Sequence, residues 1–91
     1  MELKNYMETF VLQKLDSVLK LYPDCCDCPQ CRHDIAILAL NHLPPKYVST
    51  DKGSIFARLE QMSLTYDVIV VEEIARAIEV VSEHPRHGDH P

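Results

Sequence analysis

Apolar side chains recur with helical spacing at the start of the chain, over about residues 2–22. Residues three or four apart share one face of a helix. This apolar face comprises Leu3, Met7, Phe10, Val11, Val18 and Tyr22, with Lys14 as its one polar member, and Leu12, Leu15 and Leu19 widen it. Such a wide apolar surface on one helix of a small protein indicates a subunit interface. Pro23 ends the predicted helix.

A second helix is predicted from Pro29 to about His42. Proline suits the first position of a helix, and Pro44 and Pro45 stop the segment. Residues 35–40 are apolar all round, and a buried strand could give the same run. We favour a helix because Leu and Ala outnumber the β-branched residues there.

The segment after the two prolines is expected to be extended over residues 46–50, because proline disfavours helix around it. A turn at 51–54 follows. Ser54 could then cap a short helix from Ile55 to about Met62.

A last helix is predicted to begin near Ser63 or Thr65 and to end near Glu83. Its face comprises Val70, Val71, Ile74, Ala77, Ile78 and Val81, and starts with one polar residue, Asp67. Residues 68–71 are rich in β-branched side chains, so a strand is the alternative there.

These elements predict an all-α, four-helix small domain with a short extended Pro-Pro segment. Its 91 residues fit one domain, which we place at residues 1–85, with a polar tail at 86–91. A chain this short builds a limited core, and small folds often add a metal ion, disulfides or a second subunit.

Charge and hydropathy exclude several classes of protein. The formal net charge of −5 argues against general nucleic-acid binding, which needs a basic surface. Charged residues interrupt the first 22 residues, so no signal peptide is expected, and no apolar run approaches a membrane span. We therefore expect a cytoplasmic protein with reduced thiols and no membrane insertion.

All four cysteines lie within seven residues, which is the strongest chemical signal in the sequence. They are Cys25, Cys26, Cys28 and Cys31. Cys28-Pro-Gln-Cys31 has the spacing with which two thiolates grip one tetrahedral ion, and the positive end of the following helix would favour thiolates. The sequence thus predicts a structural Zn²⁺ site. Arg32 adds positive charge beside it.

The fourth zinc ligand stays open from the sequence. Cys25 could complete the set, although adjacent ligands strain the chain, or His87 or His90 of the tail could fold back. Two other interpretations of the cluster are ordinary buried thiols and a redox pair formed by Cys28 and Cys31. A thioredoxin-like pair needs a βαβ context, which this sequence does not supply.

The block from Cys26 to Asp34, followed by Leu40-Asn-His-Leu-Pro-Pro-Lys-Tyr-Val48, resembles the late-competence ComFB family. The resemblance covers roughly residues 3–85. It implies a helical fold assembled as an intertwined homodimer and a zinc site on the C-x-C-x-x-C that matches Cys26, Cys28 and Cys31. Some cysteine-bearing members have a further cysteine near the C-terminus, and this chain has histidines there instead.

The same resemblance implies cyclic di-GMP as a ligand, because some family members are receptors for it. Such a ligand needs cations for its phosphates and a flat group for stacking. Lys46, Tyr47 and Arg58, with Lys52, lie around the Pro-Pro segment and could converge on it. Alternatively, the prolines only end a helix, the tyrosine packs and the charges are solvated.

No catalytic signature is present: the sequence lacks a Gly-rich phosphate loop, a zinc-protease motif and a triad. We therefore predict a non-enzymatic regulatory or adaptor protein of the ComFB type with a zinc site and cyclic di-GMP or protein partners. The alternatives are a thiol redox protein and a zinc-stabilised interaction module without a nucleotide ligand.

Overall fold

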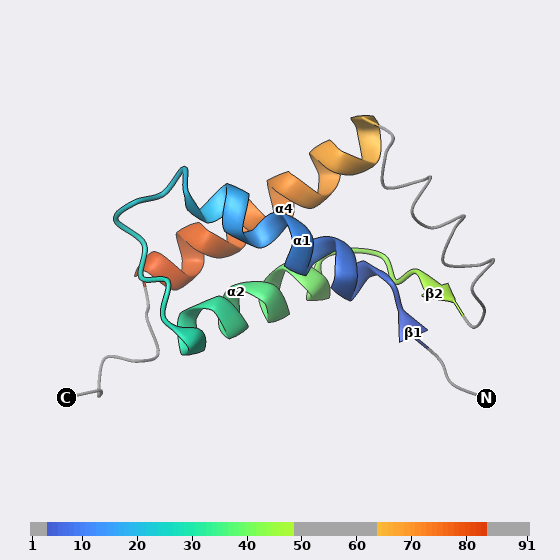
Figure 1. Cartoon of the computed structure of the whole chain (residues 1–91), viewed down its shortest axis with the longest axis horizontal. Helices are drawn as coiled ribbons and strands as arrows, with labels where there is room; N and C mark the ends of the chain where they lie inside the picture. The colour runs from blue at the N-terminus through green and yellow to red at the C-terminus, as the bar shows by residue number, and fades with distance from the viewer. Residues whose placement is uncertain (1–3, 49–63, 84–91) are drawn as a thin grey trace.

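The computed structural model describes residues 4–48 and 64–83 of the chain. These ranges contain the helices α1 (Met7–Leu19), α2 (Pro29–Asn41) and α4 (Leu64–Glu83), and the two-residue strands β1 (Lys4–Asn5) and β2 (Tyr47–Val48) (Figure 1). The expectation of a mostly helical small domain is confirmed. Three helices, rather than the predicted four, lie in the described part, because the predicted helix 55–62 falls outside it. The turn at 51–54 and the tail at 86–91 fall outside it as well.

The first predicted helix is shorter than expected, and its N-terminal end is wrong. Lys4 and Asn5 form β1, which pairs antiparallel with β2 in the register Lys4↔Val48 and Asn5↔Tyr47. The side-chain Oδ1 of Asn5 accepts hydrogen bonds from the backbone N–H of Met7 at 3.1 Å and of Lys46 at 2.8 Å. A short polar side chain that binds nearby backbone in this way offers an alternative to the helical ladder.

The C-terminal end of the first helix also stops earlier than residue 22. The backbone N–H groups of Leu21 and Tyr22 bond to carbonyls three residues back, at 3.0 and 2.9 Å. These tight turns lead the chain into Pro23 and the cysteine connector, so the helix ends within its predicted range rather than at the proline.

The second and last predicted helices are confirmed. α2 starts at Pro29 as expected, and α4 includes residues 68–71, so the strand alternative there is wrong. Helical periodicity outweighed β propensity because Val70 belongs to the continuous buried face of α4. The apolar run of α2 is not buried all round, since Ile37 remains 42% exposed.

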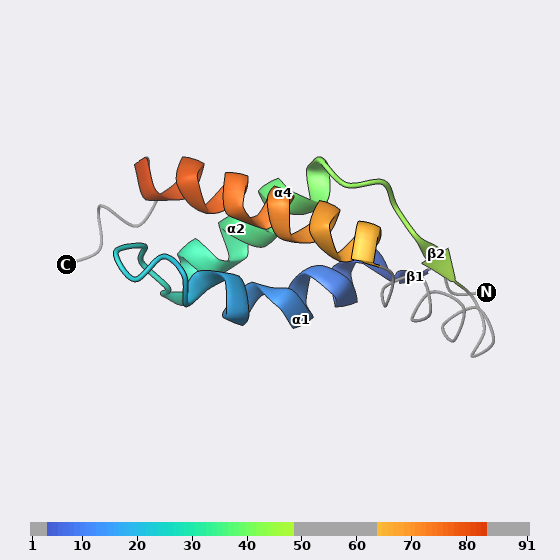
Figure 2. The same ribbon diagram turned by 90° about the horizontal axis from the view of Figure 1, so that it is seen from above.

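The three helices pack pairwise around one core, with α4 running alongside both α1 and α2 (Figure 2). α1 and α4 bury residues of the faces that their apolar spacing predicted, and α2 buries Cys31, Ile35, Ala36 and Ala39. The largest fully buried side chains are Phe10, Met7, Leu15, Ile35, Ile74, Ile78, Val11, Val70 and Cys31. On α1 the wide apolar surface is used mostly inside the protomer, because Leu15 and Leu19 are buried, whereas Leu12 is 59% exposed.

The one polar member of each long apolar face finds its partner on the other helix. Nζ of Lys14 on α1 lies 2.5 Å from a carboxylate oxygen of Asp67 on α4, and each side chain is about one-third exposed. Solvent screening limits such a pair to about 1 kcal/mol or less. The pair adds one polar contact between α1 and α4 at the edge of the apolar core.

An aromatic cluster closes the core near the β1–β2 ribbon. Phe10 meets Tyr6 edge-on at a centroid distance of 5.0 Å and Tyr66 at 5.8 Å. Nζ of Lys4 lies 5.2 Å from the Tyr6 ring, and Nζ of Lys46 lies 5.4 Å from the Tyr66 ring. The cluster therefore connects α1, α4 and the segment that follows the two prolines.

Candidate metal centre

The cysteines lie in the connector between α1 and α2 and in the first turn of α2. The connector folds back at once, because the backbone N–H of Cys25 bonds to the carbonyl of Tyr22 at 2.9 Å. Cys28 has extended backbone angles and is the N-cap of α2, and Pro29 begins the helix. The turn and the proline therefore position the thiols at the N-terminal, positive end of α2.

Three of the four thiols converge. The Sγ atoms of Cys26, Cys28 and Cys31 all lie within 4.8 Å of one another. Zn–S bonds of about 2.3 Å in a tetrahedral site hold sulfurs about 3.8 Å apart, so a small closure would bring the three to bonding distance. Cys31 is fully buried, and Cys26 and Cys28 are half-buried. Both the donor type and the spacing fit a thiolate-binding metal ion.

The backbone of α2 is arranged to support a thiolate. The N–H of Cys31 donates to Sγ of Cys28 at 3.4 Å. The N–H groups of a first helical turn carry partial positive charge, which stabilises an anion and lowers the cost of holding several thiolates together. This is the local geometry expected of a C-x-x-C metal knuckle.

The buried thiol of Cys31 is neutral in the metal-free protein at neutral pH. Burial, then hydrogen bonds to Cys28 and Cys26 and the charges of those two groups, raise the pKa of Cys31 from 9.0 to about 12. Because the folded state holds this proton more tightly than the unfolded chain, the contribution to stability is present below pH 9.0 and is lost as the pH rises toward 12. A bound cation removes the charge repulsion that opposes ionisation.

Cys25 lies apart from the group of three. Its thiol donates to the backbone carbonyl of Cys26 at 3.4 Å, and its half-buried side chain lines a hollow together with Tyr22 and Pro23. The other candidates for a fourth ligand, His87 and His90, lie outside the described residues. The identity of the fourth ligand therefore stays a prediction.

Arg32 plays a different part from the one expected. Its guanidinium group forms an ion pair with the carboxylate of Asp16, with 2.6 Å between the two atoms. The pair ties the first turn of α2 to the end of α1. The carboxylate of Asp16 balances the positive charge of Arg32.

The sequence analysis missed Asp34, the buried carboxyl group of α2. It lies one helical turn beyond Cys31 and accepts a hydrogen bond from Nε2 of Gln30 at 3.1 Å. Its burial could have been predicted from its position between Cys31 and Ile35, which both lie on the buried side of α2. The side chain adds a polar anchor to the core beside the thiols.

The predicted nucleotide-binding residues lie at the opposite end of α2 from the thiols. Tyr47 in β2 is 62% exposed, whereas Lys46 is half-buried with its Nζ near the Tyr66 ring. Arg58 lies outside the described residues. Lys46 and Tyr47 are consecutive in the chain, where β2 begins.

Within the two described ranges, we find no helix that combines the length and the apolar character needed to cross a bilayer.

Comparison with known proteins gives one consistent result. The family model described as "Late competence development protein ComFB" matches residues 4–85. The competence protein ComFB of Bacillus subtilis (strain 168) is 28% identical over 83 residues, which cover 91% of this chain and 85% of that protein. A solved structure of the late competence protein ComFB from Bacillus subtilis superposes with a TM-score of 0.80 at 27% identity, and the match covers 92% of this chain and 94% of that one. The resemblance noted in the sequence is therefore confirmed, and the chain belongs to the late-competence ComFB family.

Proposed function

We propose that this chain is a small non-enzymatic regulatory or adaptor protein of the late-competence type, with a structural zinc ion bound by Cys26, Cys28 and Cys31. The observation that carries this proposal is the convergence of the three Sγ atoms within 4.8 Å at the start of α2. Zinc is the favoured ion because thiolates in tetrahedral arrangement suit it and it needs no redox partner.

A structural role for the ion follows from where the thiols lie. Two ligands come from the connector and one from the buried face of α2, so a shared cation would fasten the connector to the core. A domain of this size gains much from such a fastening, because its hydrophobic core alone is limited. We propose Cys25, or else His87 or His90, as the fourth ligand.

Zinc affinity measured as a function of pH tests this proposal. Thiols bind zinc as thiolates, so binding should release about three protons and weaken steeply in acid. We expect the affinity, from competition with a chromogenic chelator, to fall more than about a hundredfold from ~pH 8 to ~pH 6. Affinity that is the same at both pH values would show that the ion is not held by these thiols.

The thiol redox alternative uses the same residues. A disulfide between Cys28 and Cys31 would be reversible and would exclude the metal ion from two of its ligands. Measuring the metal content and the oxidation state of the thiols distinguishes the two proposals. The redox alternative predicts a Cys28–Cys31 disulfide and no bound metal ion.

Cyclic di-GMP is a second candidate ligand, and the exposure of Tyr47 favours it. The exposed ring of Tyr47 offers a stacking face for a base. The ammonium group of the preceding residue, Lys46, lies over the Tyr66 ring and would have to turn to reach a phosphate of the ligand. If the site is used, Tyr47→Ala should weaken cyclic di-GMP binding by about 5- to 150-fold in calorimetry, the usual loss for one stacked base. Tyr47→Phe is the matched control and should retain affinity. Equal affinity of the Ala variant and the unaltered protein would remove Tyr47 from the site.

We also propose that the protein acts as a homodimer. Support comes from apolar side chains that remain exposed on the packed helices, among them Ile37, Ile69 and Val80. Exposed apolar side chains of this size are candidates for burial against a second copy.

A further inference from the structure

The thiol that lies apart from the converging group faces two hollows of the surface. Cys25 lines a larger hollow of about 400 Å³, between the end of α1 and the start of α2. It also lines a smaller hollow of about 240 Å³, between the connector and the end of α4. Cys26, Cys28 and Cys31 line neither of these two hollows. A solute that enters either hollow therefore meets Cys25 first among the four thiols.

The three converging thiols are held against the core, which restricts access to an ion between them. Cys31 is fully buried, and the half-buried Cys26 and Cys28 pack against the core cluster. An external zinc acceptor therefore cannot contact all three sulfurs at once, and their bonds to the ion have to be exchanged one at a time. Zinc permits this because it has no geometric preference from its d electrons and tolerates a fifth ligand for a short time.

The charges of the two hollows favour approach of a cation through the smaller one. Lys20 and Arg32 line the larger hollow, where they offset the two carboxylates there. The smaller hollow carries Asp24 and Ser82, and its described lining residues include no basic side chain. A negative rim raises the local concentration of cations. The smaller hollow therefore brings a divalent ion to the Cys25 thiol.

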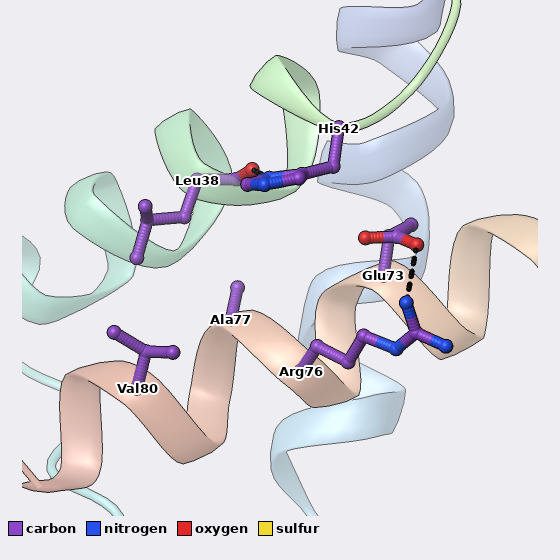
Figure 3. Close-up of a pocket in the computed structure, with 6 residues that line it drawn as sticks. All are labelled: Leu38, His42, Glu73, Arg76, Ala77 and Val80. Atoms are coloured by element: carbon purple, nitrogen blue, oxygen red, sulfur yellow. Dashed lines mark hydrogen bonds and ion pairs between the residues drawn. The ribbon is translucent and has the colours of Figure 1, made fainter.

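A third hollow, of about 250 Å³ between α2 and α4, also holds side chains that can bind metal, His42 and Glu73 (Figure 3). Each already has a partner: Nδ1 of His42 lies 2.9 Å from the carbonyl oxygen of Leu38, and Glu73 forms an ion pair with Arg76 at 3.4 Å. His42 follows the C-terminal end of α2, whose 13 residues span about 20 Å. The donor groups of this hollow are therefore too far from the thiols to pass them an ion.

We propose that Cys25 is the exchange thiol of the metal centre, the ligand through which zinc enters and leaves the site formed by Cys26, Cys28 and Cys31. The proposal rests on the zinc centre proposed above and assigns Cys25 to transfer rather than to permanent coordination. The permanent fourth ligand is then a histidine of the tail.

The exchange step needs only neighbouring groups. The Cys25 thiol gives up a weak hydrogen bond to the carbonyl of Cys26, at 3.4 Å, loses its proton to water and bonds to the ion. The bond between the ion and Cys26 then breaks, and the Cys26 thiolate takes up a proton, so charge and ligand number are conserved. Because the two residues are consecutive, the incoming sulfur is always close to the ion. Cys25 then presents the ion to the hollow, and loading follows the same steps in reverse.

Zinc transfer to a chelator tests this role. Protein loaded with one equivalent of zinc, under reducing conditions, is mixed with excess pyridylazo resorcinol, and the coloured zinc complex is followed by stopped-flow absorbance. Cys25→Ser should slow transfer by more than about tenfold, which corresponds to a barrier raised by about 1.4 kcal/mol. Loading should slow by the same factor, because a ligand used only in transit acts in both directions. The equilibrium affinity for zinc should therefore be unchanged.

Two further variants separate exchange from a structural effect. Leu21→Ser alters the wall of the smaller hollow without removing a donor, at a side chain that is 72% exposed, and should transfer zinc as fast as the unaltered protein. Cys25→His places another zinc ligand at the same position and should restore most of the transfer rate.

The outcomes also separate this inference from the zinc centre beneath it. If Cys25→Ser binds zinc more weakly and releases it faster, Cys25 is a permanent ligand, and its exchange role is wrong although the centre stands. If Cys25→Ser transfers zinc as fast as the unaltered protein, Cys25 takes no part in exchange. If the unaltered protein binds no zinc, the centre itself is wrong and the exchange role falls with it.

Discussion

Cys28→Ser is expected to abolish stoichiometric zinc binding and to lower the free energy of unfolding. In the proposed centre Cys28 would contribute a thiolate, and its Sγ also accepts a hydrogen bond from the N–H of Cys31 at the start of α2, so the substitution would remove one of the three converging ligands. Where zinc is a thousandfold above its dissociation constant, losing it costs about 4 kcal/mol of unfolding free energy. Metal content by elemental analysis and urea unfolding with and without zinc measure the two effects.

The control for this substitution is His33→Ser, an exposed position in the same first turns of α2. It should retain zinc and lose little stability, because His33 is not among the converging thiols. The assignment would be refuted if Cys28→Ser bound as much zinc as the His33 variant. The unfolded chain also binds some metal through its cysteines. The two variants are therefore best compared by the difference in their free energy of unfolding with and without zinc.

Phe10→Ala should cost about 3–5 kcal/mol of unfolding free energy, a large part of the total for a domain of this size. The ring is fully buried and meets Tyr6 and Tyr66 edge-on, so truncation leaves a cavity where α1, α4 and the ribbon join. Tyr6, which precedes α1, and Tyr66 of α4 are attached to well-packed helices, and this limits how far their rings can move into the cavity. Chemical denaturation followed by circular dichroism gives the value.

Leu12→Ala on the same helix is the matched control, because Leu12 is 59% exposed. It should change the free energy of unfolding by no more than about 0.5 kcal/mol in the monomeric protein. A comparable loss for both substitutions would mean that α1 buries a different face from the one described.

Local sequence signals were enough for the helices that proline and periodicity delimit. Pro29 marked the start of α2 correctly, and the apolar spacing of α4 prevailed over its β-branched run. The N-terminal strand could not be predicted in this way. Lys4–Asn5 pairs with Tyr47–Val48, more than forty residues away, and no window of local sequence contains that contact.

The candidate site was partly predictable for the same reason. The spacing of Cys26, Cys28 and Cys31 is local, so the sequence revealed the three thiols that converge. Where Cys25 points depends on one hydrogen bond in a turn, and the partner of Arg32 lies on another helix. The pairing of Lys14 with Asp67 was visible only as two unexplained polar residues of opposite charge in apolar faces.

Metal content of freshly purified protein, measured together with its free thiols, tests the zinc centre most directly. The protein should contain about one zinc ion per chain, and its cysteines should react fully with a thiol reagent only after the ion is chelated. Protein without a stoichiometric transition metal, whose four thiols react freely or whose Cys28 and Cys31 form a disulfide, would contradict the account.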